Sequence, residues 1–193
     1  MGRGTLVHMS RIVAFATMVV VACGSSTPAQ SPPEKGITVS RIVNVWVTKT
    51  EQLLIPTAEA LPQAMYGFAP TGGEFTGVRT FAEQVKHLAA ANYQLGSKML
   101  GEEPPAGTHD ETAPDSVRSK GQIIEYLKGS FACLHRAAAH LNEGNLETPI
   151  IVGRETETAV GLMIDALVHS SNHYGQMVEY LRMNGIVPPA SRP

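Results

Sequence analysis

The sequence has little cysteine, no excess of basic residues and no apolar run long enough to cross a bilayer. Its 193 residues include 2 cysteines, and 15 Lys and Arg residues face 17 Asp and Glu residues, for a net charge of −2. The missing basic excess argues against the electrostatic footprint of a nucleic-acid-binding protein. The apolar run at residues 12–22 is about half of the roughly 20 residues that a transmembrane helix needs. A permanent membrane span is therefore disfavoured.

That apolar run is typical of a secretory signal. Arg3 and Arg11 precede it, and Cys23 follows it directly. A basic start and a short apolar centre define a signal peptide, so we expect residues 1–22 to direct export and to be removed. Residues 20–23 (VVAC) also resemble a bacterial lipobox, in which the cysteine is acylated and becomes the mature N-terminus. The sequence thus predicts a lipid anchor at Cys23 in the cell envelope.

Ordinary signal cleavage is the alternative to the lipid anchor. Cleavage near residues 27–29 (TPA) would discard Cys23 and release a secreted or periplasmic soluble protein. In both cases Cys133 is the single free cysteine of the mature chain, so no intrachain disulfide can form. We expect Cys133 to behave as a small buried apolar residue.

Residues 23–38 are expected to form a flexible linker. The segment GSSTPAQSPPEK at residues 24–35 is rich in Ser and Pro and has almost nothing to bury. The remaining residues, 39–193, are enough for one hydrophobic core and too few for two. We therefore expect a single folded domain after the linker.

Four stretches of this domain carry apolar residues at helical spacing, and none shows the alternation of a β-strand. They are residues 39–61, 77–100, 119–141 and 158–184. Ser119 with Gln122 forms a capping-box pattern at the third start, and Gly185 followed by prolines ends the fourth. Pro56 predicts a kink or a late start in the first helix. Four amphipathic helices without strands predict an all-α four-helix bundle.

The fourth stretch contains the clearest functional signal, a pair of histidines. His169 and His173 are four residues apart, so a helix presents both imidazoles on one face, as a two-ligand metal clip does. Gln176, Met177 and Tyr180 continue that face and are expected to line the bundle interior. A third ligand has to come from elsewhere in the chain. Spacing alone leaves open that the pair is only a polar patch.

Three segments of the chain resemble the DinB-like family, the DinB/YfiT superfamily of metal-binding helical bundles. They are AEALP at residues 58–62, FAEQVKHLAAANY at 81–93 and HSSNHYGQMVEYLRMNGIVPP at 169–189. The resemblance covers roughly residues 39–191 and implies a DinB-like four-helix bundle. In that family a histidine of the second helix joins the HxxxH pair of the last helix to bind one divalent metal. The matching positions are His87, His169 and His173, and three imidazoles suit zinc, nickel or iron.

The other histidines are poor candidates for this site. His8 lies in the signal segment, and His109 lies in a loop. His135 and His140 are five residues apart and off a common helical face. We expect all four to be solvated or to cap helix ends. Glu83, on the second helix, is a candidate general base, although a solvated helix charge is the favoured interpretation.

Three histidine ligands leave coordination positions open for water or a small-molecule substrate, as catalytic metal sites do. No motif specifies a nucleophile or a base, so the catalytic residues stay unassigned. We expect an exported, lipid-anchored metal-binding protein. The alternative is a metal-dependent thiol S-transferase or isomerase, an activity that the resemblance implies for some members of the family. The sequence also leaves open that the protein forms a homodimer. If His87, His169 and His173 hold a metal, their ligand nitrogens should lie within about 3 to 4 Å of one another. Gly175, in the fourth helix, should let that helix approach a neighbour closely.

Overall fold

The structure, a computed structural model, describes residues 1–2, 36–72, 76–109 and 112–193. The contacts within it divide the chain into Met1–Glu34 and a helical domain, Lys35–Pro193. The expected signal segment, Cys23 and most of the linker lie outside the described residues, so those expectations stay predictions. Among the helices that the structure describes, none is both long and apolar enough to cross a membrane.

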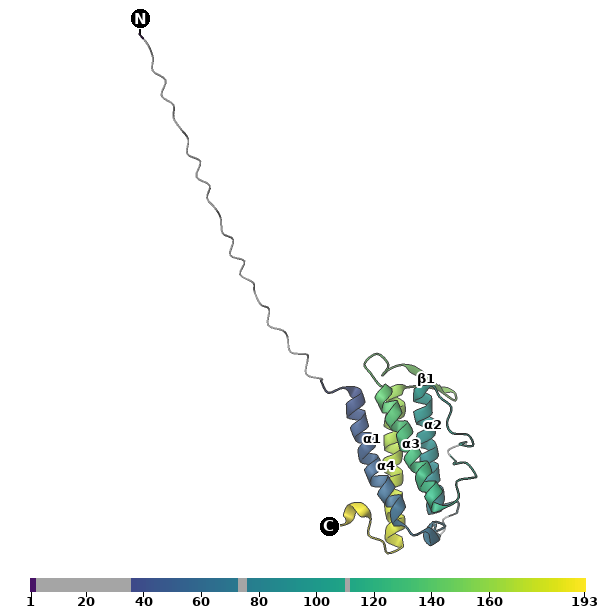
Figure 1. Cartoon of the computed structure of the whole chain (residues 1–193). Coiled ribbons are helices and arrows are strands. Elements are labelled where there is room, and N and C mark those ends of the chain that lie inside the picture. The colour runs from purple at the N-terminus through teal and green to yellow at the C-terminus, as the bar shows by residue number, and fades with distance from the viewer. Residues whose placement is uncertain (3–35, 73–75, 110–111) are drawn as a thin grey trace. The chain divides into compact units, whose positions relative to one another are not determined.

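Four long helices form the domain (Figure 1). They are α1 (Val39–Ala60), α2 (Phe81–Leu100), α3 (Lys120–His140) and α4 (Ala159–Met183). Two short 3-10 helices, η1 (Gln63–Met65) and η2 (Pro189–Ser191), follow α1 and α4. Each of the four stretches with helical spacing contains one of these helices, which confirms the prediction of four helices.

A side-chain cap sets the first residue of α2. The backbone N–H of Glu83 donates to Thr80 Oγ1 at 3.3 Å, and the backbone N–H of Thr80 donates to the Glu83 carboxylate at 2.7 Å. This capping box satisfies two backbone donors that would otherwise lack partners at the helix end. The helix therefore begins at Phe81 and not at Gly77, whose φ of +72° lies outside the helical region.

Two further expectations about helix starts are decided by the structure. The capping box predicted for Ser119 and Gln122 is present at the start of α3. Helix α1 begins at Val39 behind a Thr38 cap and runs past Pro56 to Ala60. Pro56 predicted either a kink or a late start in this helix, and the late start is therefore wrong.

The connection between α3 and α4 contains a β-hairpin, and the prediction that it would lack strands is wrong. Strands β1 (Pro149–Val152) and β2 (Glu155–Thr158) pair antiparallel, with Ile150 opposite Glu157. Gly153, with a φ of +62°, lies in the two-residue turn between them. Each strand has only 4 residues, which is too few for alternation to stand out from a loop in the sequence.

The helix ends show how the bundle is arranged. Helices α1 and α2 each lie beside α3 and α4. Lys120 Nζ donates to the carbonyl oxygens of Glu59 and Leu61, both at 2.7 Å, which holds the start of α3 against the end of α1. The Tyr180 hydroxyl donates to the Arg79 carbonyl at 2.7 Å, which joins the end of α4 to the start of α2. Helices α2 and α4 are thus antiparallel neighbours.

The core lies between the four helices and is built from large apolar side chains. Its fully buried members include Leu54, Phe81, Leu88, Leu127, Phe131, Leu134, Met163, Met177 and Leu181. On α2 and α3 they recur at intervals of three, four or seven residues, the spacing that places side chains on one helical face. Burial of these faces is the main stabilising contribution in a domain of this size.

Close approach of two helices depends on Gly96, and the expectation for Gly175 is wrong. A Cβ atom built on Gly96 in α2 would lie 2.8 Å from Cys133 Sγ in α3, whereas one on Gly175 would meet nothing within 4 Å. Cys133 is 3% exposed, as expected, and burial raises the pKa of its thiol. Since a raised pKa lowers the thiolate fraction, Cys133 is a packing residue and a poor nucleophile.

Candidate metal centre

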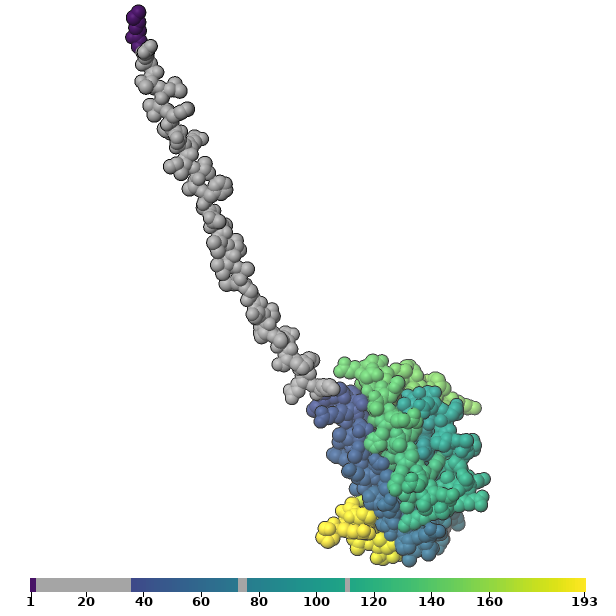
Figure 2. Space-filling model, viewed as in Figure 1, coloured from purple at the N-terminus to yellow at the C-terminus, as the bar shows by residue number. Residues whose placement is uncertain are grey.

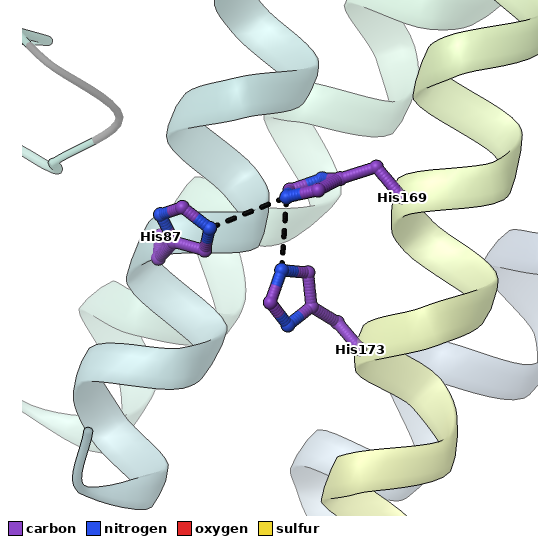
Figure 3. A group of neighbouring side chains, drawn as sticks. All are labelled: His87, His169 and His173. Carbon is purple, nitrogen blue, oxygen red and sulfur yellow. Dashed lines mark hydrogen bonds between the residues drawn. The ribbon is translucent and has the colours of Figure 1, made fainter. Parts of the chain in front are cut away.

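The site lies between α2 and α4 and starts from His87. This residue is on the second turn of α2, on the side that also buries Gln84 and Ala91. The capping box at Thr80 fixes the helix start, so it also fixes the direction of the His87 side chain two turns on. The imidazole is 6% exposed and points toward α4 (Figure 3).

The other two histidines meet His87 from α4. His169 Nε2 lies 3.2 Å from His87 Nε2 and 2.9 Å from His173 Nε2. Figure 3 shows the three rings converging from the two helices with their nitrogens directed at a common region. One nitrogen from each ring lies within 4.8 Å of the other two. The two nitrogen–nitrogen separations from His169 are therefore within the expected limit of about 3 to 4 Å.

These distances fit a tetrahedral metal site. A zinc ion with Zn–N bonds near 2.0 to 2.1 Å holds its nitrogen ligands about 3.3 to 3.4 Å apart. The separations of 3.2 and 2.9 Å are slightly shorter and the third, within 4.8 Å, can be longer, so the rings would turn to surround an ion. Imidazole nitrogens suit first-row divalent transition metals. Three protein ligands leave at least one coordination position for another molecule.

The outer nitrogen of His173 has a partner that the sequence analysis did not assign. Gln84, 2% exposed on α2, places its Nε2 2.5 Å from His173 Nδ1 and also donates to Gln176 Oε1. Gln176 Nε2 in turn donates to Asn172 Oδ1 at 3.3 Å. A metal-ligating histidine commonly donates its second ring N–H to an acceptor, and the Gln84 amide oxygen can take this role once the amide has turned. Helical spacing could have found this partner, because Gln84 lies one turn before His87.

The electrostatics of the site favour a neutral His173. Burial, together with the neighbouring His169 and His87, lowers the pKa of His173 to about 4. A neutral imidazole keeps the lone pair that a metal needs, whereas a protonated one has none to offer. The site is thus set for metal binding at neutral pH.

A second buried polar group supports α4 one turn from the site. Asn92 on α2 receives a hydrogen bond from Ser170 Oγ at 3.2 Å and donates to Ser130 Oγ at 3.4 Å. All three side chains are completely buried. Because Ser170 follows His169 directly, this contact fixes the rotation of α4 about its axis and with it the direction of the His169 side chain.

Two surface hollows border the histidine cluster. One, of about 210 Å³, includes His169 together with Gln94, Lys98 and Asp165. The other, of about 410 Å³, includes His87. A small molecule can reach the neighbourhood of the cluster from either hollow. A hollow of about 570 Å³, between the start of α1 and the end of α3, includes none of the three histidines.

The remaining candidates from the sequence fall outside this cluster. Glu83 lies beside the hollow that includes His87, but its carboxylate caps α2, and the hydrogen bonds from Thr80 lower its pKa. His109 is exposed, as expected. His135 is not simply solvated: its Nδ1 lies 2.6 Å from Asn44 Oδ1 and its Nε2 3.0 Å from Glu51 Oε2.

That His135 contact corrects the expectation of a solvated or capping side chain. The imidazole bridges α3 and α1, and it is half-buried because α1 packs over it. His140, at the end of α3, is exposed. His8 lies outside the described residues. Of the three residues expected to line the bundle interior from α4, Met177 and Tyr180 are buried. The expectation is wrong for Gln176, which is exposed and accepts a hydrogen bond from Gln84.

Solved structures with this arrangement of helices exist. A conserved protein from Enterococcus faecalis is 17% identical, with a TM-score of 0.63 over 77% of this chain and 98% of its own. A DinB-like protein from Bacillus subtilis is 19% identical, with a TM-score of 0.56 over 75% and 92%. A DinB-like protein from Bacillus cereus is 14% identical, with a TM-score of 0.58 over 79% and 96%. At these identities the likeness shows the fold alone.

The sequence itself identifies the family. A search of curated proteins found no match. The sequence pattern of the DinB superfamily, however, matches residues 47–177, which is more than half of the chain and includes all three clustered histidines. The match confirms the resemblance seen in the HxxxH segment and in the second helix. The chain therefore belongs to the DinB superfamily.

Proposed function

We propose that this protein binds one divalent transition metal, zinc, nickel or iron, through His87, His169 and His173. The observation that carries the proposal is the convergence of three imidazole nitrogens from two different helices, at 3.2 and 2.9 Å from the central one. Two ligands four residues apart on α4 define one edge of the site, and α2 supplies the third. Buried polar groups on both helices hold the rings in place.

The residues of the chain perform separate tasks at this centre. The three histidines hold the ion, Gln84 orients His173, and Ser170 orients α4 through Asn92. A bound ion with three histidine ligands supplies Lewis acidity at its open positions. The low pKa of His173 keeps a ligand nitrogen free of protons at neutral pH.

Metal analysis of the protein purified without a polyhistidine tag tests this proposal. We expect about one equivalent of metal per chain, and the double substitution His169→Ala and His173→Ala should remove it. His109→Ala, at an exposed loop position, is the matched control and should leave the stoichiometry unchanged. Unchanged metal content in the double variant would exclude the three-histidine site.

We further propose that the protein is exported and held in the cell envelope by a lipid on Cys23. The apolar run and the VVAC segment support this location. Cys23→Ser should release the protein from the membrane fraction or leave it at precursor mass. Full-length, unprocessed wild-type protein in the soluble cytoplasmic fraction would contradict the proposal.

Metal-dependent thiol transfer or isomerisation is the second candidate function. The observation that favours it is the hollow beside His169, whose Lys98 and Asp165 can bind polar groups of a small substrate. Adding a low-molecular-weight thiol to a cobalt-substituted sample should then change the visible spectrum, and His87→Ala should abolish the change. An unchanged spectrum at saturating thiol would leave metal binding intact and exclude thiol transfer at this centre.

A further inference from the structure

The outward face of α1 carries exposed apolar side chains at helical spacing. The most exposed on the helix is Trp46, at 54%. Ile42, Val45 and Leu53 are between 38% and 47% exposed. Ile37, just before the helix, lines the same shallow hollow as Trp46. These five residues are named the α1 stripe, and none of them contributes to the buried core.

The charged side chains beside the stripe are cationic. Arg41 lines the shallow hollow, and Lys49 Nζ lies 4.5 Å from the centre of the Trp46 ring. A cation over an aromatic face keeps both groups at the surface, close to each other. Within the part of the chain that the structure describes, neither Arg41 nor Lys49 forms an ion pair.

The acidic residues of α1 pair with side chains of α3. Glu51 Oε2 lies 3.0 Å from His135 Nε2, and Glu59 Oε1 lies 3.4 Å from Lys128 Nζ, and both partners are on α3. The acidic groups of α1 thus have partners on α3, whereas Arg41 and Lys49 border the apolar stripe. An apolar stripe flanked by cations and carrying a tryptophan has the chemistry of a surface that lies in the interface of an anionic bilayer.

The position of the stripe in the chain fits this surface. Gly36 follows Cys23 by 13 positions, so the connecting chain reaches at most about 45 Å when extended. A lipid on Cys23 would thus keep α1, a helix about 33 Å long, within reach of the membrane. In Figure 2 the helix, in dark blue, lies at the edge of the domain with its outer side uncovered. This step rests on the proposed anchor.

A second copy of the chain is a weaker occupant of the stripe. A stable protein interface takes about 20 to 30 residues from each partner, and the stripe has five. In a symmetric dimer the same surface of both copies meets, so Arg41 and Lys49 would face their own equivalents across a small area. Anionic headgroups complement these cations, whereas a second copy repeats them.

We propose that the α1 stripe is a membrane-docking surface, which lies against anionic phospholipid headgroups with Trp46 in the interfacial layer. The stripe adds a second, weaker contact to the lipid on Cys23. A second contact of this kind strengthens retention at the membrane. Docking also gives the domain a fixed orientation, with α1 toward the bilayer.

Trp46 is the single tryptophan of the chain, so its fluorescence reports on the stripe alone. The full chain carrying Cys23→Ser, which has no lipid, is mixed with vesicles of phosphatidylglycerol and phosphatidylethanolamine. We expect the emission to shift to shorter wavelength and brominated acyl chains to quench it, as for a tryptophan at the membrane interface. Vesicles of phosphatidylcholine alone should give a much smaller change, and high salt should reduce the anionic response.

Substitutions in the stripe separate its apolar and cationic contributions. Ile42→Ser with Leu53→Ser should lower the vesicle partition coefficient roughly tenfold, and Arg41→Gln or Lys49→Gln should each lower it about fivefold. Ile151→Ser is the matched control, because Ile151 is 69% exposed on the hairpin and outside the stripe. Circular dichroism confirms that the variants remain helical.

Each outcome distinguishes docking from anchoring. Trp46 emission that does not respond to anionic vesicles would overturn the docking proposal, even if labelling shows a lipid on Cys23. Loss of acylation with an intact Trp46 response would overturn the anchor alone. A blue-shifted emission without vesicles, together with a doubled mass in sedimentation, would assign the stripe to a dimer and would also overturn docking.

Discussion

Gln84 is the residue through which α2 acts on His173. Its amide lies 2.5 Å from His173 Nδ1 and is buried. When His173 Nε2 binds a metal, Nδ1 carries the proton and needs an acceptor. The Gln84 amide offers both a donor and an acceptor, so a half-turn about its last bond places the oxygen opposite Nδ1–H. The exposed Gln176 can turn with it.

Replacing Gln84 should therefore weaken metal binding without removing a ligand. Gln84→Leu keeps the size of the side chain and deletes the acceptor, and we expect the metal affinity to fall about 10- to 100-fold. Competition with a chromophoric chelator measures the change. Gln52→Leu, the same substitution at an exposed position of α1, is the control. Equal affinities for the two variants would show that Gln84 does not orient His173.

The low pKa of His173 makes the metal-free protein sensitive to acid. The pKa is about 4 in the folded chain and near 6.5 when His173 is solvated. As the pH falls below about 6.5, the unfolded chain takes up a proton that the folded chain resists until about pH 4, so the free energy of unfolding decreases across this window. Metal binding should weaken over the same range.

Urea unfolding of the metal-free protein at several pH values between 4 and 7 measures this effect. Wild-type protein should lose more stability on acidification than His173→Gln, which lacks the titrating group at position 173. The comparison removes the contribution of carboxylates common to both proteins. Parallel pH profiles for the two proteins would contradict the assignment of a low pKa to His173.

Among the helices, the contact of α2 with α3 tolerates the least added volume. A Cβ on Gly96 would lie 2.8 Å from Cys133 Sγ, and the site is buried. Gly96→Ala should lower the free energy of unfolding by about 1 to 3 kcal/mol, because overpacking outweighs the better helix propensity of alanine. Adding Cys133→Ala should recover part of this loss, since it shortens the side chain that clashes.

Gly175→Ala is the matched control for this contact. Gly175 lies inside α4, and nothing is within 4 Å of a Cβ built there. Alanine should therefore stabilise the domain by about 0.5 to 1 kcal/mol through helix propensity alone. Denaturant unfolding measures both variants. Destabilisation at Gly175 equal to that at Gly96 would show that the two glycines do not differ in packing.

Across the whole molecule, a bound metal should join α2 to α4 and stabilise the fold. A ligand that binds only the folded state adds about 2.7 kcal/mol at a free concentration 100 times its Kd. For a domain of this size that corresponds to a rise in Tm of about 5 to 10 °C. Chelation should remove the increase, and His87→Ala should melt at one temperature with or without metal. A metal-independent Tm for wild-type protein would contradict a site that bridges the two helices.

The sequence predicted those features that depend on local spacing. Helical periodicity gave four helices, and the Ser119 and Gln122 pattern gave the start of α3, because a helix and its cap are formed by residues close in the chain. The pairing of His169 with His173 is local for the same reason. The expected lipid anchor depends on residues that the structure does not describe, and it stays a prediction.

Tertiary structure decided whatever depends on residues distant in the chain. His87 reaches His169 only because α2 and α4 are antiparallel neighbours, and its role was inferred from family resemblance and not from spacing. The partners of His135, the contact at Gly96 and the hydrogen bond from Gln84 to the site likewise arise between different helices. Periodicity shows that a helix face is buried, but packing alone selects the residue it is buried against.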